Sequence, residues 1–229
     1  MRVLLLVDIL NDFCPGGALA VPEGDQTARI ATQLAASGEF DEVIAVCEEH
    51  PKGHVSYASS HWEAEPYTEV TIGNKVQRVW PDHCEKGTFG AELHADIDRS
   101  LITKYFTKGG DKKVDSYSAF FDNDGIQTGL YKVLKELANQ RGESEGEIEL
   151  FVCGLATDWC VKFTVLDARK LGLSTTLIVD GCRAINLAEG DELRAFKEMR
   201  IAGADLIESR ELLPDAKARA VSIEQHVNP

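Results

Sequence analysis

The sequence changes from a strand-like to a helix-like pattern within the stretch Glu147-Ile-Glu-Leu-Phe-Val-Cys-Gly-Leu-Ala-Thr-Asp-Trp-Cys160. Residues 147–153 form an apolar run with the length and composition of a buried strand. The apolar side chains of residues 161–171 then recur at helical spacing, and Gly172 is a typical helix stop. A second apolar run follows at 175–179. The stretch therefore opens a strand–helix–strand unit.

The same alternation runs along the rest of the chain. Runs too apolar to face water predict buried strands, and amphipathic segments between them predict helices. This alternation is typical of an α/β fold, with a mainly parallel sheet covered by helices on both faces. In such sheets, ligands bind at the carboxyl ends of the strands. The expected strands are 3–7, 42–47, 101–106, 147–153, 175–179 and 205–207, and the expected helices are 30–36, 129–137, 161–171 and 189–201.

One long segment, residues 49–100, interrupts this alternation of strands and helices. It has little periodicity and is far longer than the dozen or so residues of an ordinary connection. Its composition is wrong for a linker, so we interpret it as part of the functional site. We find no internal repeat and no second domain, and we expect residues 1–229 to form one domain. The aromatic and imidazole side chains of the segment are His50, His54, His61, Trp62, Trp80, His83 and His94.

Composition and charge exclude several classes of protein. The 229 residues are 44% hydrophobic and 27% charged, which is ordinary for a globular protein. A net charge of −14 repels phosphate backbones and anionic membranes, so we expect no nucleic-acid and no membrane partner. The apolar run at the amino terminus is short and broken by Asp8 and Asp12, unlike a signal peptide. The six cysteines contain no C-x-x-C pair. We therefore expect a cytoplasmic protein with reduced thiols. The protein could also form a homo-oligomer, which the sequence does not decide.

Cys160 is the cysteine best placed to be a nucleophile. It lies where a strand gives way to a helix, and the positive end of a helix dipole stabilises a thiolate. We therefore expect its pKa to lie below the free value of about 8.5. The unpaired amides of the same turn could stabilise an oxyanion. The alternative is an ordinary buried structural cysteine.

Asp8 and Lys108 stand at two further strand ends. Asp8 ends the first strand, where a buried carboxylate is costly unless it is paired. Lys108 follows the third strand. Each has an ordinary explanation, since Asp8 could cap a turn and Lys108 could be a surface lysine. Together with Cys160 they would supply a base, a cation and a nucleophile on the predicted ligand side of the sheet.

A second group of residues could bind a metal. Glu48, His50 and His54 follow the second strand, and His83 lies further along the same long segment. Imidazoles and a carboxylate suit Zn²⁺, Fe²⁺ or Mn²⁺. Solvated loop histidines are the alternative explanation. His61, His94 and His226 are interpreted as having no functional role.

Five motifs connect these residues to a known family: Val7-Asp-Ile-Leu-Asn-Asp-Phe-Cys-Pro-Gly-Gly17 with Leu19-Ala-Val-Pro22, His50-Pro51 with His54, Trp80-Pro-Asp-His-Cys84, Lys108-Gly109 with Asp115-Ser-Tyr-Ser-Ala-Phe-Phe121, and Gly154-Leu-Ala-Thr-Asp-Trp-Cys-Val-Lys-Phe-Thr164. Together they resemble the nicotinamidases (pyrazinamidases) of the isochorismatase-like cysteine hydrolase family. The resemblance runs from the first residue to about residue 207.

The resemblance implies a six-stranded parallel sheet and a role for each matched residue. Cys160 would be the nucleophile, Asp8 the general acid and base, and Lys108 the third member of a triad. The amides of Ala156 and Cys160 would form the oxyanion hole, beside a cis peptide between Leu155 and Ala156. The implied substrate-pocket residues are Phe13, Trp80, Tyr117 and Leu155, and the implied metal-site residues are Glu48, His50, His83 and His54.

One departure from the family concerns the metal. The family reads Asp, an aromatic residue and then His, whereas this sequence reads Glu48-Glu49-His50. Glu48 still offers a carboxylate oxygen, one methylene further from the backbone. The resemblance implies one divalent metal ion, zinc in the first place, with iron or manganese as alternatives.

The implied reaction is the deamidation of nicotinamide, a small-molecule substrate, to nicotinate and ammonia through a cysteine thioester. Two other functions stay open at this point. A related cysteine hydrolase could act on another small amide or on isochorismate. A non-catalytic metal-binding module could also use the same fold.

Overall fold

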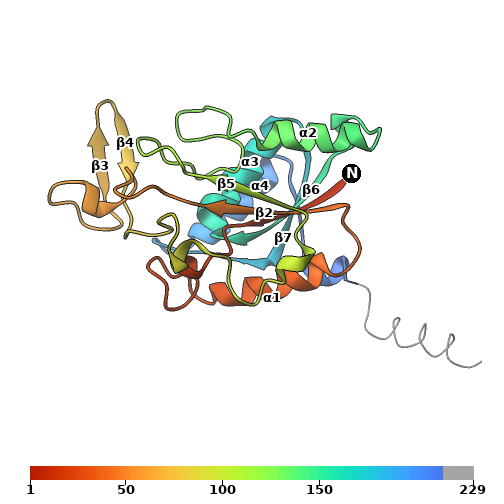
Figure 1. Cartoon of the computed structure of the whole chain (residues 1–229), viewed down its shortest axis with the longest axis horizontal. Helices are drawn as coiled ribbons and strands as arrows, with labels where there is room; N and C mark the ends of the chain where they lie inside the picture. Colours follow the sequence, from red (N-terminus) through yellow and green to blue (C-terminus); the bar gives the residue numbers. More distant parts are fainter. Residues whose placement is uncertain (214–229) are drawn as a thin grey trace, which may run out of the picture.

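A six-stranded parallel sheet forms the centre of the molecule in the computed structural model, which describes residues 1–213 (Figure 1). Its strand order is β5-β2-β1-β6-β7-β8, and every neighbouring pair is parallel. This confirms the predicted sheet. The strands are β1 (Arg2–Val7), β2 (Glu42–Glu48), β5 (Lys104–Lys108), β6 (Glu149–Leu155), β7 (Ser174–Arg183) and β8 (Asp205–Ile207).

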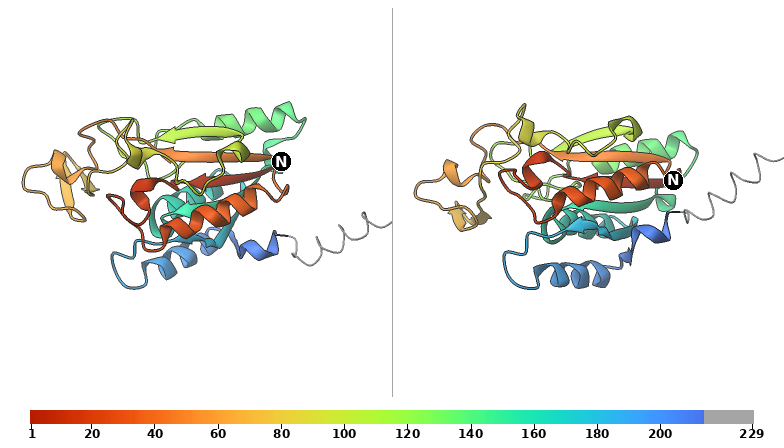
Figure 2. Two further views of the ribbon diagram at one scale, coloured as in Figure 1. Left: turned by 60° about the horizontal axis from the view of Figure 1, so that its bottom comes forward. Right: turned by 90° about the horizontal axis from the view of Figure 1, so that it is seen from below.

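Helices cover the sheet on both faces. Figures 1 and 2 show α1 on one side of the sheet and α2 on the other. β1 lies in the middle of the sheet, and its side chains from Val3 onward are fully or almost fully buried. A strand covered on both faces must be apolar throughout, which explains its uninterrupted run of Val and Leu. The helices are α1 (Gly24–Ala35), α2 (Leu130–Gln140), α3 (Lys162–Lys170) and α4 (Asp191–Ile201).

The long segment between β2 and β5 contains structure that the sequence pattern did not predict. An antiparallel hairpin, β3 (Glu69–Ile72) and β4 (Lys75–Arg78), projects at one end of the molecule (Figure 1). Most of its side chains are exposed, so it has no apolar face to produce a strand-like pattern. Short 3₁₀ turns lie at Asn11–Phe13, Ala58–Ser60, Phe89–Ala91, Arg99–Leu101, Glu145–Glu147 and Ser209–Glu211.

The order of the strands brings four strand ends to one edge of the sheet. Lys108 ends β5, Glu48 ends β2, Asp8 follows β1, and β6 ends just before the segment that carries Cys160. Glu48 and Lys108 are direct partners in the β2–β5 register. The third strand was expected at residues 101–106. The structure has it as β5, which begins and ends later and includes Lys108.

Among residues 1–213, no helix is long and apolar enough to cross a membrane. The segment after residue 213, with His226, lies outside the described residues.

Candidate active site

Lys108 is the centre of a buried charged cluster. Its Nζ lies 2.9 Å from Oδ2 of Asp8 and 3.0 Å from Oε1 of Glu48. It donates a hydrogen bond to the carbonyl oxygen of Ser116 at 2.9 Å and lies 3.5 Å from Sγ of Cys160. All of these side chains are buried. The structure therefore brings together the three residues expected to form a triad, although more than 50 residues separate each from the next in the sequence.

The two carboxyl groups beside Lys108 differ in how readily they bind a proton. Burial raises the pKa of Asp8 to about 6, although Lys108 opposes the shift. Burial also disfavours ionised Glu48, but Lys108 and His50 outweigh it and hold its pKa well below the usual range. Oδ2 of Asp8 faces the ammonium group of Lys108, whereas Oδ1 is buried without a hydrogen-bond partner among residues 1–213. Asp8 is therefore the carboxylate that is ready to take up a proton near neutral pH.

The thiol of Cys160 corrects one sequence-based expectation. Burial raises its pKa well above the ordinary value, Asp8 and Glu48 add to the effect, and Lys108 opposes it. The expected lowering by the helix terminus is therefore wrong for the resting site. A thiol that keeps its proton needs a base before it can attack a carbonyl, and Asp8 contacts the same ammonium group.

The turn that presents Cys160 has an unusual backbone. A cis peptide joins Leu155 to Ala156, as the resemblance implied. Residues Thr157–Val161 form a π-type turn before α3, and Trp159 within it has non-helical angles, φ −126° and ψ −108°. Gly154, with φ +130°, precedes this turn, and a Cβ atom there would lie 2.0 Å from the carbonyl oxygen of Val7. A glycine is therefore required where β6 passes β1 beside the site.

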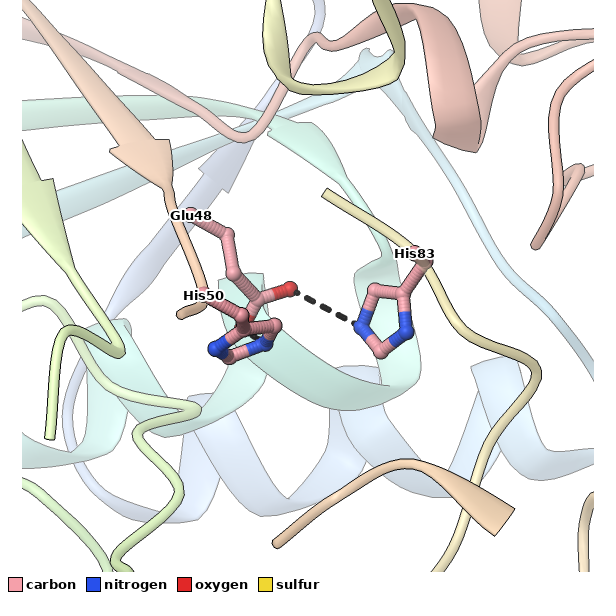
Figure 3. A group of neighbouring side chains, drawn as sticks. All are labelled: Glu48, His50 and His83. Carbon is pink, nitrogen blue, oxygen red and sulfur yellow. Dashed lines mark ion pairs between the residues drawn. The ribbon is translucent and has the colours of Figure 1, made fainter. Parts of the chain in front are cut away.

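Glu48, His50 and His83 point toward a common centre (Figure 3). Nδ1 of His50 lies 2.8 Å from the carbonyl oxygen of Gly109, and Nδ1 of His83 lies 2.7 Å from that of Pro81. These contacts place a proton on each Nδ1 and leave both Nε2 atoms facing Glu48, each 3.4 Å from a carboxylate oxygen. Nε2 of His50 is buried and has no hydrogen-bond partner among the described residues.

This arrangement fits a divalent cation. Two imidazole nitrogens and a carboxylate converge, and each histidine is oriented by a backbone carbonyl as metal-binding histidines usually are. Gly109, with φ +74°, allows the close approach, because a Cβ atom there would lie 2.6 Å from Cε1 of His50. The donor set of two nitrogens and a carboxylate suits zinc, iron or manganese.

His54 occupies a different position from the other two histidines. Its Nδ1 lies 2.7 Å from Oγ of Ser56, and its Nε2 lies 2.9 Å from the carbonyl oxygen of Asp111. Its ring stacks on that of His50, with 3.8 Å between the ring centroids. Burial and the neighbouring His50 lower its pKa to about 4. Both nitrogens of His54 are therefore already hydrogen-bonded, and its ring supports His50.

A pocket opens beside Cys160. The pocket includes Phe13, Trp80 and Tyr117, which the sequence predicted. Leu155 does not line the pocket, because its side chain is fully buried in the core and Ala156 reaches the surface of the pocket instead. The full set of lining residues is Phe13, Leu19, Glu48, Trp80, His83, Asp115, Tyr117, Ala156, Trp159, Cys160 and Ile185.

Four of these residues were missed by sequence reasoning: Leu19, Asp115, Trp159 and Ile185. The first three lie within the motifs quoted above, so the motifs themselves could have identified them. Ile185 lies just beyond the carboxyl end of β7, and the rule that ligands bind at strand ends is the signal that could have found it.

Aromatic rings form one wall of the pocket. The ring centroids of Trp80 and Trp159 are 4.7 Å apart at nearly a right angle, and those of Tyr117 and Trp159 are 5.2 Å apart. Nε1 of Trp80 donates a hydrogen bond to the hydroxyl of Tyr117 at 3.3 Å. The edge-to-face pair, the tilted pair and the hydrogen bond fix the three rings against one another, and their apolar surfaces suit an aromatic substrate.

Comparison with known proteins places the chain among similar sequences and folds. The isochorismatase domain profile matches residues 2–211. The nicotinamidase of Escherichia coli (strain K12) is 48% identical over 209 residues, which cover 90% of this chain and 93% of that protein. The structure of a nicotinamidase and pyrazinamidase of Acinetobacter baumanii has a TM-score of 0.84 and 38% identity, covering 93% of this chain and 98% of that one. A pyrazinamidase of Pyrococcus horikoshii in complex with zinc has a TM-score of 0.69 and 28% identity, covering 90% and 98%.

Proposed function

The chain belongs to the isochorismatase family, and on this premise we propose that it is a nicotinamidase that hydrolyses nicotinamide to nicotinate and ammonia. The observation that carries this proposal is the shared ammonium group of Lys108. It contacts Asp8 at 2.9 Å and Sγ of Cys160 at 3.5 Å, and Cys160 lines a pocket with an aromatic wall. A base, a nucleophile and a place for a planar ring therefore lie side by side.

In the proposed reaction, Asp8 takes the proton of the Cys160 thiol, and the thiolate attacks the carboxamide carbon. The amides of Ala156 and Cys160 would hold the oxyanion of the tetrahedral intermediate. Asp8 returns its proton to the departing nitrogen, and the C–N bond breaks to give ammonia and a thioester. Asp8 then accepts a proton from water, whose oxygen attacks the thioester carbon. The C–S bond breaks, Asp8 passes its proton to Sγ to restore the thiol, and the product leaves as nicotinate after its carboxyl group loses a proton to solvent.

Glu48, His50 and His83 would hold one divalent metal ion. We propose zinc, because the donors suit it and a relative's structure is described with zinc, and we keep iron and manganese as alternatives. A bound metal would supply a Lewis acid that anchors the ring nitrogen of the substrate and so orients its carboxamide. His54 would keep His50 in position, since both of its own nitrogens are occupied.

Ammonia release tests this function. We expect release from nicotinamide and pyrazinamide, and much less from a small aliphatic amide that cannot pack against the aromatic wall. Cys160→Ala should abolish release, and mass spectrometry of the wild type during turnover should find a nicotinoyl thioester on this cysteine. Cys182→Ala is the control, because Cys182 is buried but does not line the pocket. Faster turnover of the aliphatic amide, or an acyl group on another cysteine, would contradict the proposal.

A further inference from the structure

Ile185 lines the pocket and lies in an irregular segment between β7 and α4. Residues 184–190 join these two elements, and most of their side chains are exposed. Ile185 is the exception that matters here, because it is half-buried, packs against the core and lines the pocket together with Cys160. A segment with this exposure needs specific contacts to keep one side chain in place.

Asp158 supplies these contacts. It lies in the nucleophile turn, two residues before Cys160, and its side chain is 4% exposed. One carboxylate oxygen accepts a hydrogen bond from the amide of Ile185 at 3.0 Å, and the other accepts one from the amide of Asn186 at 2.8 Å. A buried carboxylate that accepts two amide bonds fixes the backbone of the segment with charge-assisted bonds, which are stronger than neutral ones.

The same segment is fixed a second time through α4. Asn186 has φ +53°, and its Oδ1 accepts a hydrogen bond from the amide of Glu192 in the first turn of α4. Oε1 of Glu192 in turn accepts a hydrogen bond from the hydroxyl of Thr157, at 3.2 Å, beside Asp158. The contacts close into a ring that begins and ends in the nucleophile turn. The position of Ile185 is therefore defined relative to Cys160.

We propose that Ile185, held in place by Asp158, is a specificity-determining residue that limits the size of the substituents a substrate ring can carry. This inference rests on the proposed hydrolysis of a planar carboxamide. Ile185 is β-branched and therefore stiff, so it cannot rotate away easily to admit a bulkier ring. Its side chain has no polar atom, so it excludes by shape alone. Asp158 touches neither the pocket nor Lys108, and acts as a positioning residue.

A substrate panel tests the role of Ile185. The probes are nicotinamide and its four ring-methylated forms, with the methyl group at each free ring carbon. We expect Ile185→Ala to raise kcat/KM for at least one methylated form, relative to nicotinamide, by about 10-fold or more, since one extra methyl group in an apolar pocket changes selectivity by that order. Leu187→Ala is the matched control, because Leu187 lies in the same segment, is exposed and does not line the pocket. In Leu187→Ala, the kcat/KM of each methylated form relative to nicotinamide should equal the wild-type value.

A double-mutant cycle tests the role of Asp158. Asp158→Asn loses one of the two amide contacts. Like Ile185→Ala, it should raise kcat/KM for a methylated form relative to nicotinamide. The combined variant should then gain less than the product of the two single changes, because Asp158 acts through Ile185. A merely structural role for Asp158 would lower kcat/KM for every probe equally and leave the ratios unchanged.

The outcomes separate this inference from the proposed function. If the wild type releases no ammonia from nicotinamide, the proposed function fails. If the wild type turns over nicotinamide but Ile185→Ala leaves all four ratios unchanged while remaining folded by thermal melting, the inference alone is overturned. Ile185→Val removes only one methyl group, so it serves as a second test if Ile185→Ala does not fold. It should raise the same ratio of kcat/KM values by a smaller factor.

Discussion

Lys108 carries one positive charge, and two carboxylates and a thiol share it. When Asp8 takes the proton from Cys160, one negative charge moves from oxygen to sulfur and the net charge of the buried cluster does not change. This is important because creating a new charge in a buried site is far more costly than moving one. Glu48 stays ionised throughout, since Lys108 and His50 keep its pKa well below the usual range despite burial.

The acid limb of the pH profile follows from Asp8. Its pKa of about 6 means that Asp8 is protonated, and cannot act as a base, at lower pH. We therefore expect kcat/KM for nicotinamide to be constant above this pH and to fall below it. Asp8→Asn should lower kcat by about 10²- to 10⁴-fold, the usual contribution of a general base. A near-normal rate in this variant, or a profile with no change near pH 6, would assign the base to another group.

Metal affinity depends on Glu48 more than on its neighbour. Glu48→Gln removes the charge between two imidazoles and should weaken zinc binding by at least 10-fold, whereas Glu48→Asp should keep or improve it. Competition with a chelator measures the affinity without reference to activity. Glu49→Gln is the matched control, because Glu49 pairs with Lys86 at the surface and does not reach the cluster. Equal affinities for the Glu48→Gln and Glu49→Gln variants would exclude Glu48 as a ligand.

At the scale of the elements, the hairpin β3–β4 is connected to the pocket although it projects from the molecule. Nε2 of Gln77 donates a hydrogen bond to Oδ2 of Asp115, a buried residue that lines the pocket, at 2.9 Å. The guanidinium of Arg78 lies 5.8 Å from the ring centroid of Trp159. The hairpin therefore supports one side of the pocket from behind.

A substitution in the hairpin should change substrate binding. Gln77→Leu leaves one oxygen of the buried Asp115 without a partner, at a cost of about 1–3 kcal/mol. We expect KM for nicotinamide to rise several-fold while kcat changes less, because the hairpin touches none of the reacting groups. Steady-state kinetics measure both quantities. Lys75→Ala, which breaks only an exposed ion pair with Asp124, should leave both unchanged. An unchanged KM in Gln77→Leu would show that the hairpin is independent of the pocket.

The sequence predicted those elements whose burial leaves a pattern, and it missed the others for physical reasons. The inner strands β1, β2 and β6 are recognisable because burial on both faces requires apolar side chains. The edge strands β5 and β8 are partly exposed, and the bounds predicted for β5 lie too early in the chain. The hairpin has no buried face, so it leaves no such pattern. The three triad residues could be found from strand ends and motifs. The raised pKa of Cys160 could not be predicted from the sequence, because it depends on burial and on carboxylates that other strands bring close to the thiol.

At the scale of the whole molecule, the metal site should contribute to stability. A ligand that binds only the folded chain stabilises it by about 2.7 kcal/mol at 100 times its Kd. For a chain of this size, that corresponds to a rise in Tm of roughly 5 to 10 °C. We expect zinc to produce such a rise in the metal-stripped protein, as measured by calorimetry. The same experiment on a Glu48→Gln, His83→Gln variant should show no rise, and an equal rise there would place the stabilising metal elsewhere.

The central position of β1 has a consequence for folding during synthesis of the protein. Arg2 pairs with Glu149, so β1 is made well before β6, one of its two neighbours in the sheet. At ordinary rates of synthesis, about 5–20 residues per second, this interval lasts on the order of ten seconds. During that time a strand of Val and Leu has one unpaired edge, which invites aggregation. A nascent chain that lacks β6 therefore exposes this edge, and the complete sheet covers it.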